Sequence, residues 1–254
     1  MATPLNSETT HTVRRTLEFV QHHRLAKGDR LPSERELSER FGVARSSVRE
    51  ALAVLDAMRI TERKPKSGIF LRNAVEDGGL DALVLQADLG LAFDPQVTRD
   101  VTEARIICEE QALRIACRRR TDADLAKLHR LLDGYAGLVD ADRNPADADV
   151  DFHLALVAAS QNRILVRTLT PLMLMSTNWR RRYFDSAAIR RRSLDDHRAF
   201  VAAIEARDEA ATSALVQRHV QTAAADVRAL AEQGGATATD TPSKSDTRAS
   251  DAPT

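Results

Sequence analysis

The sequence predicts a mostly α-helical protein of two parts, and three observations support this fold class. The chain has 254 residues, which is more than one minimal domain needs. Hydrophobic residues make up 43% of it but aromatic residues only 4%, so aliphatic side chains must fill the core, which favours helices over sheets. Apolar residues also recur at helical spacing through most of the chain after about residue 80.

The net charge of zero conceals a difference between the two parts. Residues 1–72 contain 14 Lys and Arg against 9 Asp and Glu, and the remaining residues contain 23 against 28. A basic first part is typical of a domain that binds nucleic acid. The alternative is that an excess of this size on a small domain is ordinary variation.

The first part, residues 1–72, has the element order of a winged helix-turn-helix domain. Ser33 and Glu36 form the N-cap and third position of a capping box, which marks the start of the second helix. Gly42 separates that helix from the third. In order, the expected elements are a helix over residues 9–21, a helix that starts after Ser33, a helix over residues 46–58, and strands over residues 60–64 and 68–72.

The second part is expected to be an all-α bundle over residues 80–232, joined to the first by a polar linker at residues 73–79. About seven helices are expected in it, over residues 80–91, 95–119, 122–140, 146–160, 163–184, 189–206 and 208–231. Residues 233–254 have no apolar periodicity and are expected to be a disordered tail.

Several classes of protein are disfavoured. No stretch approaches the roughly 20 uninterrupted apolar residues of a membrane span, and the first residues lack the apolar core of a secretory signal. Cys108 and Cys117 lie on opposite faces of one expected helix and cannot pair with each other. A reduced, cytoplasmic protein without a membrane partner is the simplest interpretation.

Polar and basic residues open the third helix, where a recognition helix meets base edges in the major groove. Arg45 and Arg49 lie one turn apart on the expected exposed face, and each guanidinium can address a guanine. Ser46 and Ser47 are short donors suited to phosphate oxygens. The alternative is that these side chains only form the solvent-exposed face of the helix and contact no DNA. Further candidates are Arg35 at the start of the second helix, and Lys64, Lys66 and Gly68 at the turn between the strands.

Three of the seven histidines fall on apolar helix faces and are expected to point into the bundle: His153, His197 and His219. Asp149 lies one helical turn before His153, so the two side chains share a face. Three imidazoles and a carboxylate can bind a first-row divalent metal ion. The alternative is that the histidines are hydrogen-bonded core residues, but burying such a cluster is costly unless it coordinates something.

The first part resembles the DNA-binding domain of the GntR family of bacterial transcription regulators. The segment LPSERELSERFGVARSSVREALAVLDAMRITERKPKSGIFL carries that family's Pro-Ser-Glu-Arg start, Gly-Val-x-Arg turn and Val-Arg-Glu-Ala-Leu helix. By position, the resemblance implies DNA contacts at Arg35, Arg45, Ser46, Ser47, Arg49 and Gly68. Ala44 departs from the pattern, because many relatives have a helix-capping serine there.

The second part is similar to the FCD effector domain of the FadR-like branch of the same family. The pattern of Asp149, His153, His197 and His219 matches the metal ligands of that domain. The resemblance implies zinc, or nickel or a similar ion, with a small carboxylic acid beside it. It also implies that Arg105 helps to hold the acid, although Arg105 can instead form a helical ion pair with Glu109. The acyl-CoA-binding members lack this set of four residues.

The sequence therefore predicts a homodimeric bacterial transcription regulator, with repression as the commoner mode, that binds a palindromic operator in double-stranded DNA. Its affinity is expected to respond to a small carboxylate effector, and its location is the cytoplasm, at the nucleoid when it is bound to the operator. Two alternatives stay open: a regulator that senses the metal alone, and a metal-dependent hydrolase, which leaves the basic first part unexplained. We expect no enzyme activity and no catalytic residue. The sequence does not determine which acid, which metal or which target genes are involved. It also leaves the roles of three consecutive arginines open, Arg180, Arg181 and Arg182.

Overall fold

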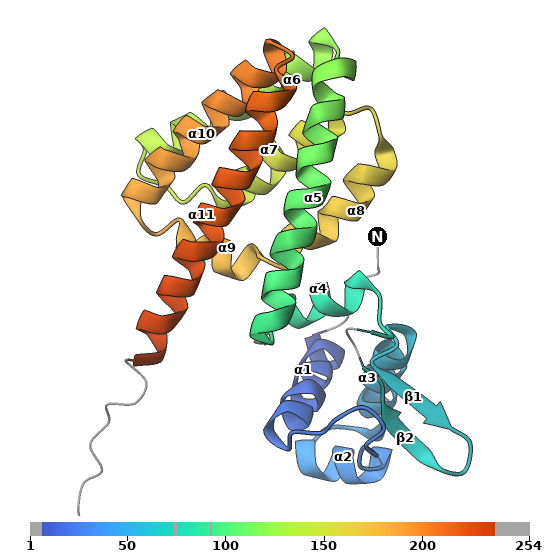
Figure 1. Ribbon diagram of the computed structural model, residues 1–254. Helices are drawn as coiled ribbons and strands as arrows, with labels where there is room; N and C mark the ends of the chain where they lie inside the picture. Colours follow the sequence, from blue (N-terminus) through green and yellow to red (C-terminus); the bar gives the residue numbers. More distant parts are fainter. Residues whose placement is uncertain (1–6, 74–75, 92, 237–254) are drawn as a thin grey trace, which may run out of the picture.

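The computed structural model describes residues 7–73, 76–91 and 93–236, and it confirms a mostly helical fold with a small N-terminal sheet (Figure 1). The head, as we call residues 7–73, contains α1 (Ser7–His22), α2 (Glu34–Phe41), α3 (Arg45–Ala57), β1 (Thr61–Lys64) and β2 (Gly68–Leu71). The two strands are antiparallel, with Lys64 opposite Gly68 at the turn. This is the winged helix-turn-helix order that the sequence predicts.

Local signals in the sequence explain where the helices of the head begin and end. Ser33 caps α2 and accepts the backbone N–H of Glu36, whose carboxylate in turn accepts the backbone N–H of Ser33. Gly42 ends α2 in the left-handed conformation with φ 63°, which glycine adopts at little cost. Ala44 occupies the N-cap position of α3 and, as the sequence predicts, provides no side-chain hydrogen bond there.

The body, as we call residues 93–236, contains seven helices, and α4 joins it to the head. The bounds are α4 (Leu80–Asp88), α5 (Pro95–Arg119), α6 (Asp122–Asp140), α7 (Ala146–Ala158), α8 (Arg163–Leu174), α9 (Thr177–Tyr183), α10 (Ala187–Glu205) and α11 (Glu209–Ala236). In Figure 1, α5 and α11 lie side by side and run in opposite directions. Within the described part of the chain, no helix is both long and apolar enough to span a membrane.

Two expectations about these helices are wrong. The single helix expected over residues 163–184 is broken at Met175 and Ser176 into α8 and α9. Pro171 lies within α8, and its carbonyl still accepts the Met175 backbone N–H at 3.0 Å, so the proline does not itself end the helix. At the break, the Ser176 hydroxyl and backbone N–H both donate to the Met173 carbonyl, at 2.8 Å and 3.2 Å, so a tight turn replaces the next turn of α8. In addition, α11 continues to Ala236, so the first residues of the expected tail are helical, and residues 237–254 lie outside the described residues.

Helix α4 packs against both parts of the protein. Ala82 and Leu89 belong to the apolar core of the head, whereas Leu83 and Ala87 belong to the core of the body. Ala82 and the C-cap residue Leu89 lie on one face of this short helix, and Leu83 and Ala87 lie on another, so two of its faces are apolar. The helix also packs on α8 and α9. Residues 80–88 are therefore shared by the two cores, whereas the sequence assigns them to the body alone.

Candidate functional site

The four predicted metal ligands come together in the interior of the body. Asp149 and His153 lie on α7, one turn apart, His197 lies on α10 and His219 on α11. Each of the four side chains is at most 7% exposed. One nitrogen from each histidine lies within 4.8 Å of the others, which places three imidazoles around one point. This convergence of three helices is what the sequence pattern predicts.

The polar atoms that face this point lack ordinary partners. Asp149 Oδ1 lies 3.3 Å from His197 Nε2 and 3.8 Å from His153 Nε2, and neither Asp149 Oδ1 nor His153 Nε2 has a hydrogen-bond partner among the described residues. Buried nitrogen and oxygen atoms without partners are costly. Imidazole nitrogen and carboxylate oxygen are also the donors that divalent first-row metals prefer. The residues present therefore fit a metal ion at this point.

Two acidic residues contact the Nδ1 atoms of His153 and His219 and orient these two rings. Glu109 Oε1 on α5 lies 3.4 Å from His153 Nδ1, and Asp196 Oδ2 on α10 lies 3.0 Å from His219 Nδ1. With Nδ1 directed to a carboxylate, the Nε2 atom of each ring is directed elsewhere, as in carboxylate–histidine–metal arrangements. The sequence does not indicate Asp196 as a partner of His219, and it indicates Glu109 only as an ion-pair partner of Arg105. Nothing in the local spacing reveals either contact, because each one joins different helices.

The charge states of the cluster suit metal coordination at neutral pH. Burial lowers the pKa of His197 to about 4, and burial also lowers the pKa of His219, so both rings are neutral. Burial opposes ionisation of Asp149, but His153 and Arg180 outweigh it and hold the pKa of this carboxyl well below its usual value. Burial likewise opposes ionisation of Glu109, yet Arg105 and His153 bring its pKa to about 2. A side chain must be deprotonated to bind a metal ion. Asp149, His197 and His219 are already deprotonated at neutral pH, so they need to lose no proton before a metal ion binds.

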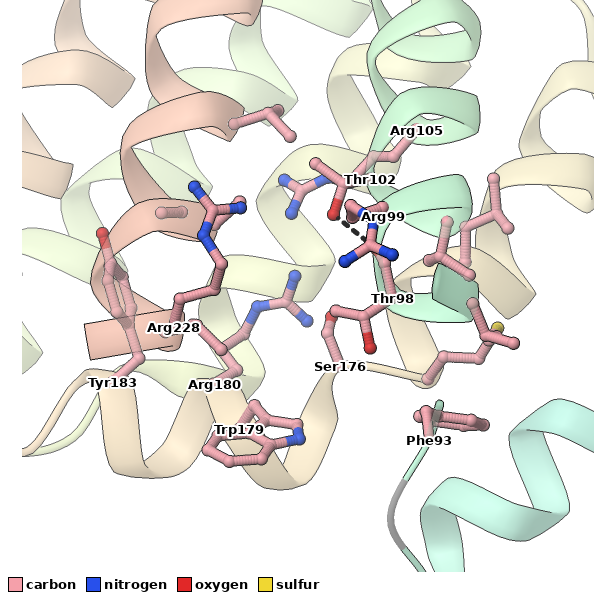
Figure 2. Close-up of a pocket in the computed structure, with 18 of the residues that line it drawn as sticks. Phe93, Thr98, Arg99, Thr102, Arg105, Ser176, Trp179, Arg180, Tyr183 and Arg228 are labelled. Carbon is pink, nitrogen blue, oxygen red and sulfur yellow. Dashed lines mark hydrogen bonds between the residues drawn. The ribbon is translucent and has the colours of Figure 1, made fainter. Parts of the chain in front are cut away.

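A cavity of about 440 Å³ adjoins the cluster, and arginine side chains extend into it (Figure 2). Arg180 is 6% exposed and its Nε lies 2.8 Å from Asp149 Oδ2. Arg105 Nε lies 3.2 Å from Glu109 Oε1, so the helical ion pair considered for Arg105 exists while the same side chain lines the cavity. The cavity therefore presents two guanidinium groups next to the histidine cluster, each paired with a buried carboxylate.

The structure separates the three consecutive arginines that the sequence leaves unassigned. Arg180 lines the cavity and was missed as a site residue. Arg181 is on the surface and pairs with Asp147 at 3.4 Å. Arg182 lies over the ring of Trp179, with 5.9 Å between the guanidinium carbon and the ring centroid. Only the first of the three therefore contributes to the site.

The head presents most of its predicted DNA-binding residues to solvent. Arg45, Ser46 and Arg49 are exposed along α3, and neither arginine forms a hydrogen bond or ion pair with another described residue. Arg35 is exposed and pairs with Glu39 at 3.1 Å. Lys66 is exposed in the turn between β1 and β2.

Ser47 and Gly68 differ from the other predicted DNA-binding residues. Ser47 is 7% exposed, and its hydroxyl donates to Glu8 Oε1 on α1 at 2.6 Å, so it links α1 to α3. The expectation that Ser47 faces solvent, where it could contact phosphate, is not met. Gly68 has φ 121°, and a Cβ there would lie 2.7 Å from Arg30 Nε. The positive φ therefore favours glycine at this position next to the turn of the wing.

Comparison with known proteins links both parts to transcription regulators. Residues 10–71 match the bacterial regulatory proteins of the gntR family, and residues 100–222 match the FCD domain. The "Uxu operon regulator" of Haemophilus influenzae is 34% identical over 55% of this chain, and the match spans 50% of that protein. The "Galactonate operon transcriptional repressor" of Escherichia coli is 28% identical over 74% of this chain and 83% of that protein. The solved structure of Lar, described as controlling the Listeria monocytogenes agr system, shares the fold with a TM-score of 0.63 at 19% identity, covering 90% of this chain and all of that one.

Proposed function

This chain belongs to the GntR family of bacterial regulatory proteins and carries an FCD domain, and we propose that it is a DNA-binding transcription regulator controlled by a small carboxylic acid bound beside a divalent metal ion. The observation that carries the proposal is the buried cluster of three histidines and Asp149 next to a cavity lined by Arg105 and Arg180. The relatives above are named as regulators of operons, and one of them as a repressor, so we propose repression. We assign no catalytic residue.

In this proposal the head reads operator DNA through α3. Arg45 and Arg49 would contact base edges in the major groove, and Ser46 would contact phosphate. Arg35 and Lys66 would contact the backbone on either side, with Gly68 allowing the wing to approach a groove. The support is that the four basic side chains are exposed on one domain, and only Arg35 forms an ion pair among the described residues.

In the body, Asp149, His153, His197 and His219 would hold the metal, with zinc favoured and nickel or another first-row ion as the alternative. The ion would supply a localised positive charge that attracts a carboxylate. Arg105 would bind the same acid. The support is that its guanidinium lines the cavity and that its ion pair with Glu109 leaves its other N–H donors available. A galactonate operon repressor among the relatives is consistent with an acid as the effector.

Helix α4 offers a physical route from the cavity to the head. Leu172 and Met175 of the α8 segment and Arg180 of α9 line the cavity, and α4 packs on both α8 and α9. The opposite face of α4 belongs to the core of the head. An acid that shifts α8 or α9 would therefore shift the head, with a coupling of about 1–3 kcal/mol between acid and operator binding.

We also propose that the regulator acts as a homodimer. Ile107 on α5 is 57% exposed and Ile164 on α8 is 67% exposed, and these two helices pack against each other. Large exposed apolar side chains on adjacent helices are typical of a surface that another chain covers. A symmetric dimer would place two heads on a palindromic operator in the bacterial cytoplasm.

Metal content and stability together test the metal part of the proposal. In chelator, the melting temperature of the wild-type protein should fall, whereas that of the His219→Ala variant should hardly change, because little metal is bound to it. His129→Ala, at an exposed position outside the cluster, should respond to chelator like the wild type. A wild-type protein that contains no metal, takes none up and keeps its melting temperature in chelator would show that the histidines are core residues.

DNA selected from a random pool by the full chain tests the regulatory part. The selected sites should be palindromic, and added carboxylic acids should change the affinity of the metal-loaded protein for them. If metal alone changes the affinity and no acid has an effect, the chain is a metal sensor and the acid proposal fails.

A further inference from the structure

The cavity extends well beyond the end that is lined by Asp149, Arg105, Arg180 and His219. On α5, cavity-lining positions recur from Arg105 back to Val97, and on α11 they recur from His219 forward to Val227. These intervals are eight residues each, or about 12 Å of helix. Because α5 and α11 run in opposite directions side by side, both walls extend the same way from the histidine cluster (Figure 1). The cavity is therefore elongated, with Asp149, Arg105 and Arg180 at its inner end.

The walls of this extension are mainly hydrocarbon. Val97 and Val101 line it from α5, and Val220, Ala223 and Val227 line it from α11. Aromatic side chains complete it, among them Phe93 and Trp179, which Figure 2 shows at its edge. Arg99 and Arg228 also border the cavity, but both are exposed and can remain solvated. A ligand group in this region would meet CH groups on most sides.

Four hydroxyl side chains line the cavity: Thr98, Thr102, Ser176 and Tyr183. The Tyr183 hydroxyl accepts from Arg192 at 3.1 Å, and the other three donate to nearby backbone carbonyls. Thr102 donates to the Thr98 carbonyl and Ser176 donates to the Met173 carbonyl, each at 2.8 Å. Thr98 donates more weakly to the Asp94 carbonyl at 3.5 Å. No Asn or Gln side chain lines the cavity within the described residues. A ligand that carries a hydroxyl on every carbon would bury most of these groups without a partner, which is unfavourable.

We propose that the acid this chain binds is amphipathic, with a carboxylate at the inner end and an aliphatic or aromatic hydrocarbon body along the α5 and α11 walls. The inference rests on the proposed function, because the inner end is the metal and arginine site described above. Arg105 and Arg180 supply the charge that selects an acid, and the valine-rich extension selects its body. The cavity volume of about 440 Å³ is within the range for ligands much larger than a three-carbon acid.

Calorimetric titration of the zinc-loaded full chain with butanoate, hexanoate, octanoate and gluconate tests this inference. Each added methylene should tighten binding by roughly fourfold until the cavity is filled. Hexanoate should bind more tightly than gluconate, which has the same number of carbons but a hydroxyl on five of them. Phenylpropanoate, titrated in parallel, distinguishes a flat aromatic body from a linear one.

Matched variants locate the body of the acid. Val97→Thr keeps the shape of the side chain but replaces one methyl group by a hydroxyl, so it should weaken octanoate severalfold and leave butanoate nearly unchanged. Val139→Thr on α6 is the same substitution outside the cavity and should change neither. Arg105→Gln should weaken all the acids alike. Melting curves of each variant by circular dichroism check that the fold is retained.

The outcomes separate this inference from the proposed function. If gluconate binds as tightly as hexanoate or more tightly, the amphipathic ligand is wrong while an acid-binding site stands. The same conclusion follows if affinity does not rise with chain length. If none of the acids binds to the zinc-loaded protein, the proposed effector site fails together with the inference.

Discussion

Asp149 has different neighbours at its two oxygens, and this asymmetry defines the site at the scale of single residues. Oδ2 forms an ion pair with Arg180 at 2.8 Å, whereas Oδ1 faces the histidines without a hydrogen bond. Both side chains are nearly fully buried. A buried carboxylate that loses its ion-pair partner is strongly destabilising unless another positive charge replaces it.

Removing Arg180 should therefore make folding depend on metal. In chelator, Arg180→Met should lower the free energy of unfolding by about 3–5 kcal/mol, because it leaves Asp149 charged and buried. Zinc should restore much of this loss by supplying charge beside Oδ1. Urea unfolding with and without zinc measures both quantities, and Arg181→Met at a surface ion pair is the control, with little expected effect. An equal loss in zinc and in chelator would contradict a metal site at Asp149.

Arg49 is the residue at which base recognition can be tested most directly. Its side chain is exposed on α3 and makes no ion pair with a described residue. Arg49→Ala should cost about 1–3 kcal/mol of operator affinity and relax the preference at one base pair. Lys66→Ala in the wing should instead weaken specific and random DNA alike. Binding of labelled duplexes by fluorescence anisotropy distinguishes the two, and uniform weakening by Arg49→Ala would show that this arginine contacts only phosphate.

At the scale of elements, the break between α8 and α9 places Arg180 in the site. The guanidinium of Arg180 donates to the Met173 carbonyl at 3.1 Å, near the C-terminus of α8, while Nε reaches Asp149. A cationic side chain at a helix C-terminus satisfies carbonyls that have no partner within the helix. The interruption at Met175 and Ser176 is thus part of how the cavity is built.

A second capping box fixes the start of α6. Thr121 accepts the backbone N–H of Asp124, and the Asp124 carboxylate accepts the backbone N–H of Thr121 at 2.8 Å. Thr121→Ala should lower the free energy of unfolding by about 1 kcal/mol. Thr168→Ala, at an exposed site within α8, should have a smaller effect or none, because alanine is the better helix former. Urea denaturation of both variants checks this, and equal losses would mean that the cap contributes nothing.

At the scale of the whole molecule, the distribution of charge separates the head from the body, whereas the packing of the apolar cores joins them. The excess of basic residues is confined to the head, as a DNA-binding domain requires. The apolar cores of head and body, however, meet on opposite faces of α4. The two parts are therefore mechanically joined by a helix that neither family match includes.

The proposed dimer can be tested on the exposed isoleucines. Ile164→Asp and Ile107→Asp should each shift the chain from dimer to monomer in analytical ultracentrifugation, because a charge in an apolar interface is not paired. Leu80→Asp, at a position that is 37% exposed on α4, should leave the dimer intact. A dimer that survives both isoleucine changes would place the interface on another surface.

Much of the fold could be predicted because its signals are local. The capping box at Ser33, the glycine at Gly42 and the four-residue interval between Asp149 and His153 act over one helical turn, so the sequence shows them directly. The proline at Pro171 is equally local, but a proline inside a helix can bend it or end it. Contacts with Ser176 and Arg180 decided the outcome here.

The sequence alone determined most of the elements, though not the break between α8 and α9, and it determined the apolar faces that carry the three histidines and the exposed basic face of α3. Only the tertiary structure decided which residues meet from different helices: Glu109 with His153, Asp196 with His219 and Arg180 with Asp149. It also turned Ser47 towards Glu8, away from solvent. Backbone hydrogen bonds and periodicity act over about four residues. These pairs instead join residues 23 to 44 positions apart, whose approach depends on how whole helices pack.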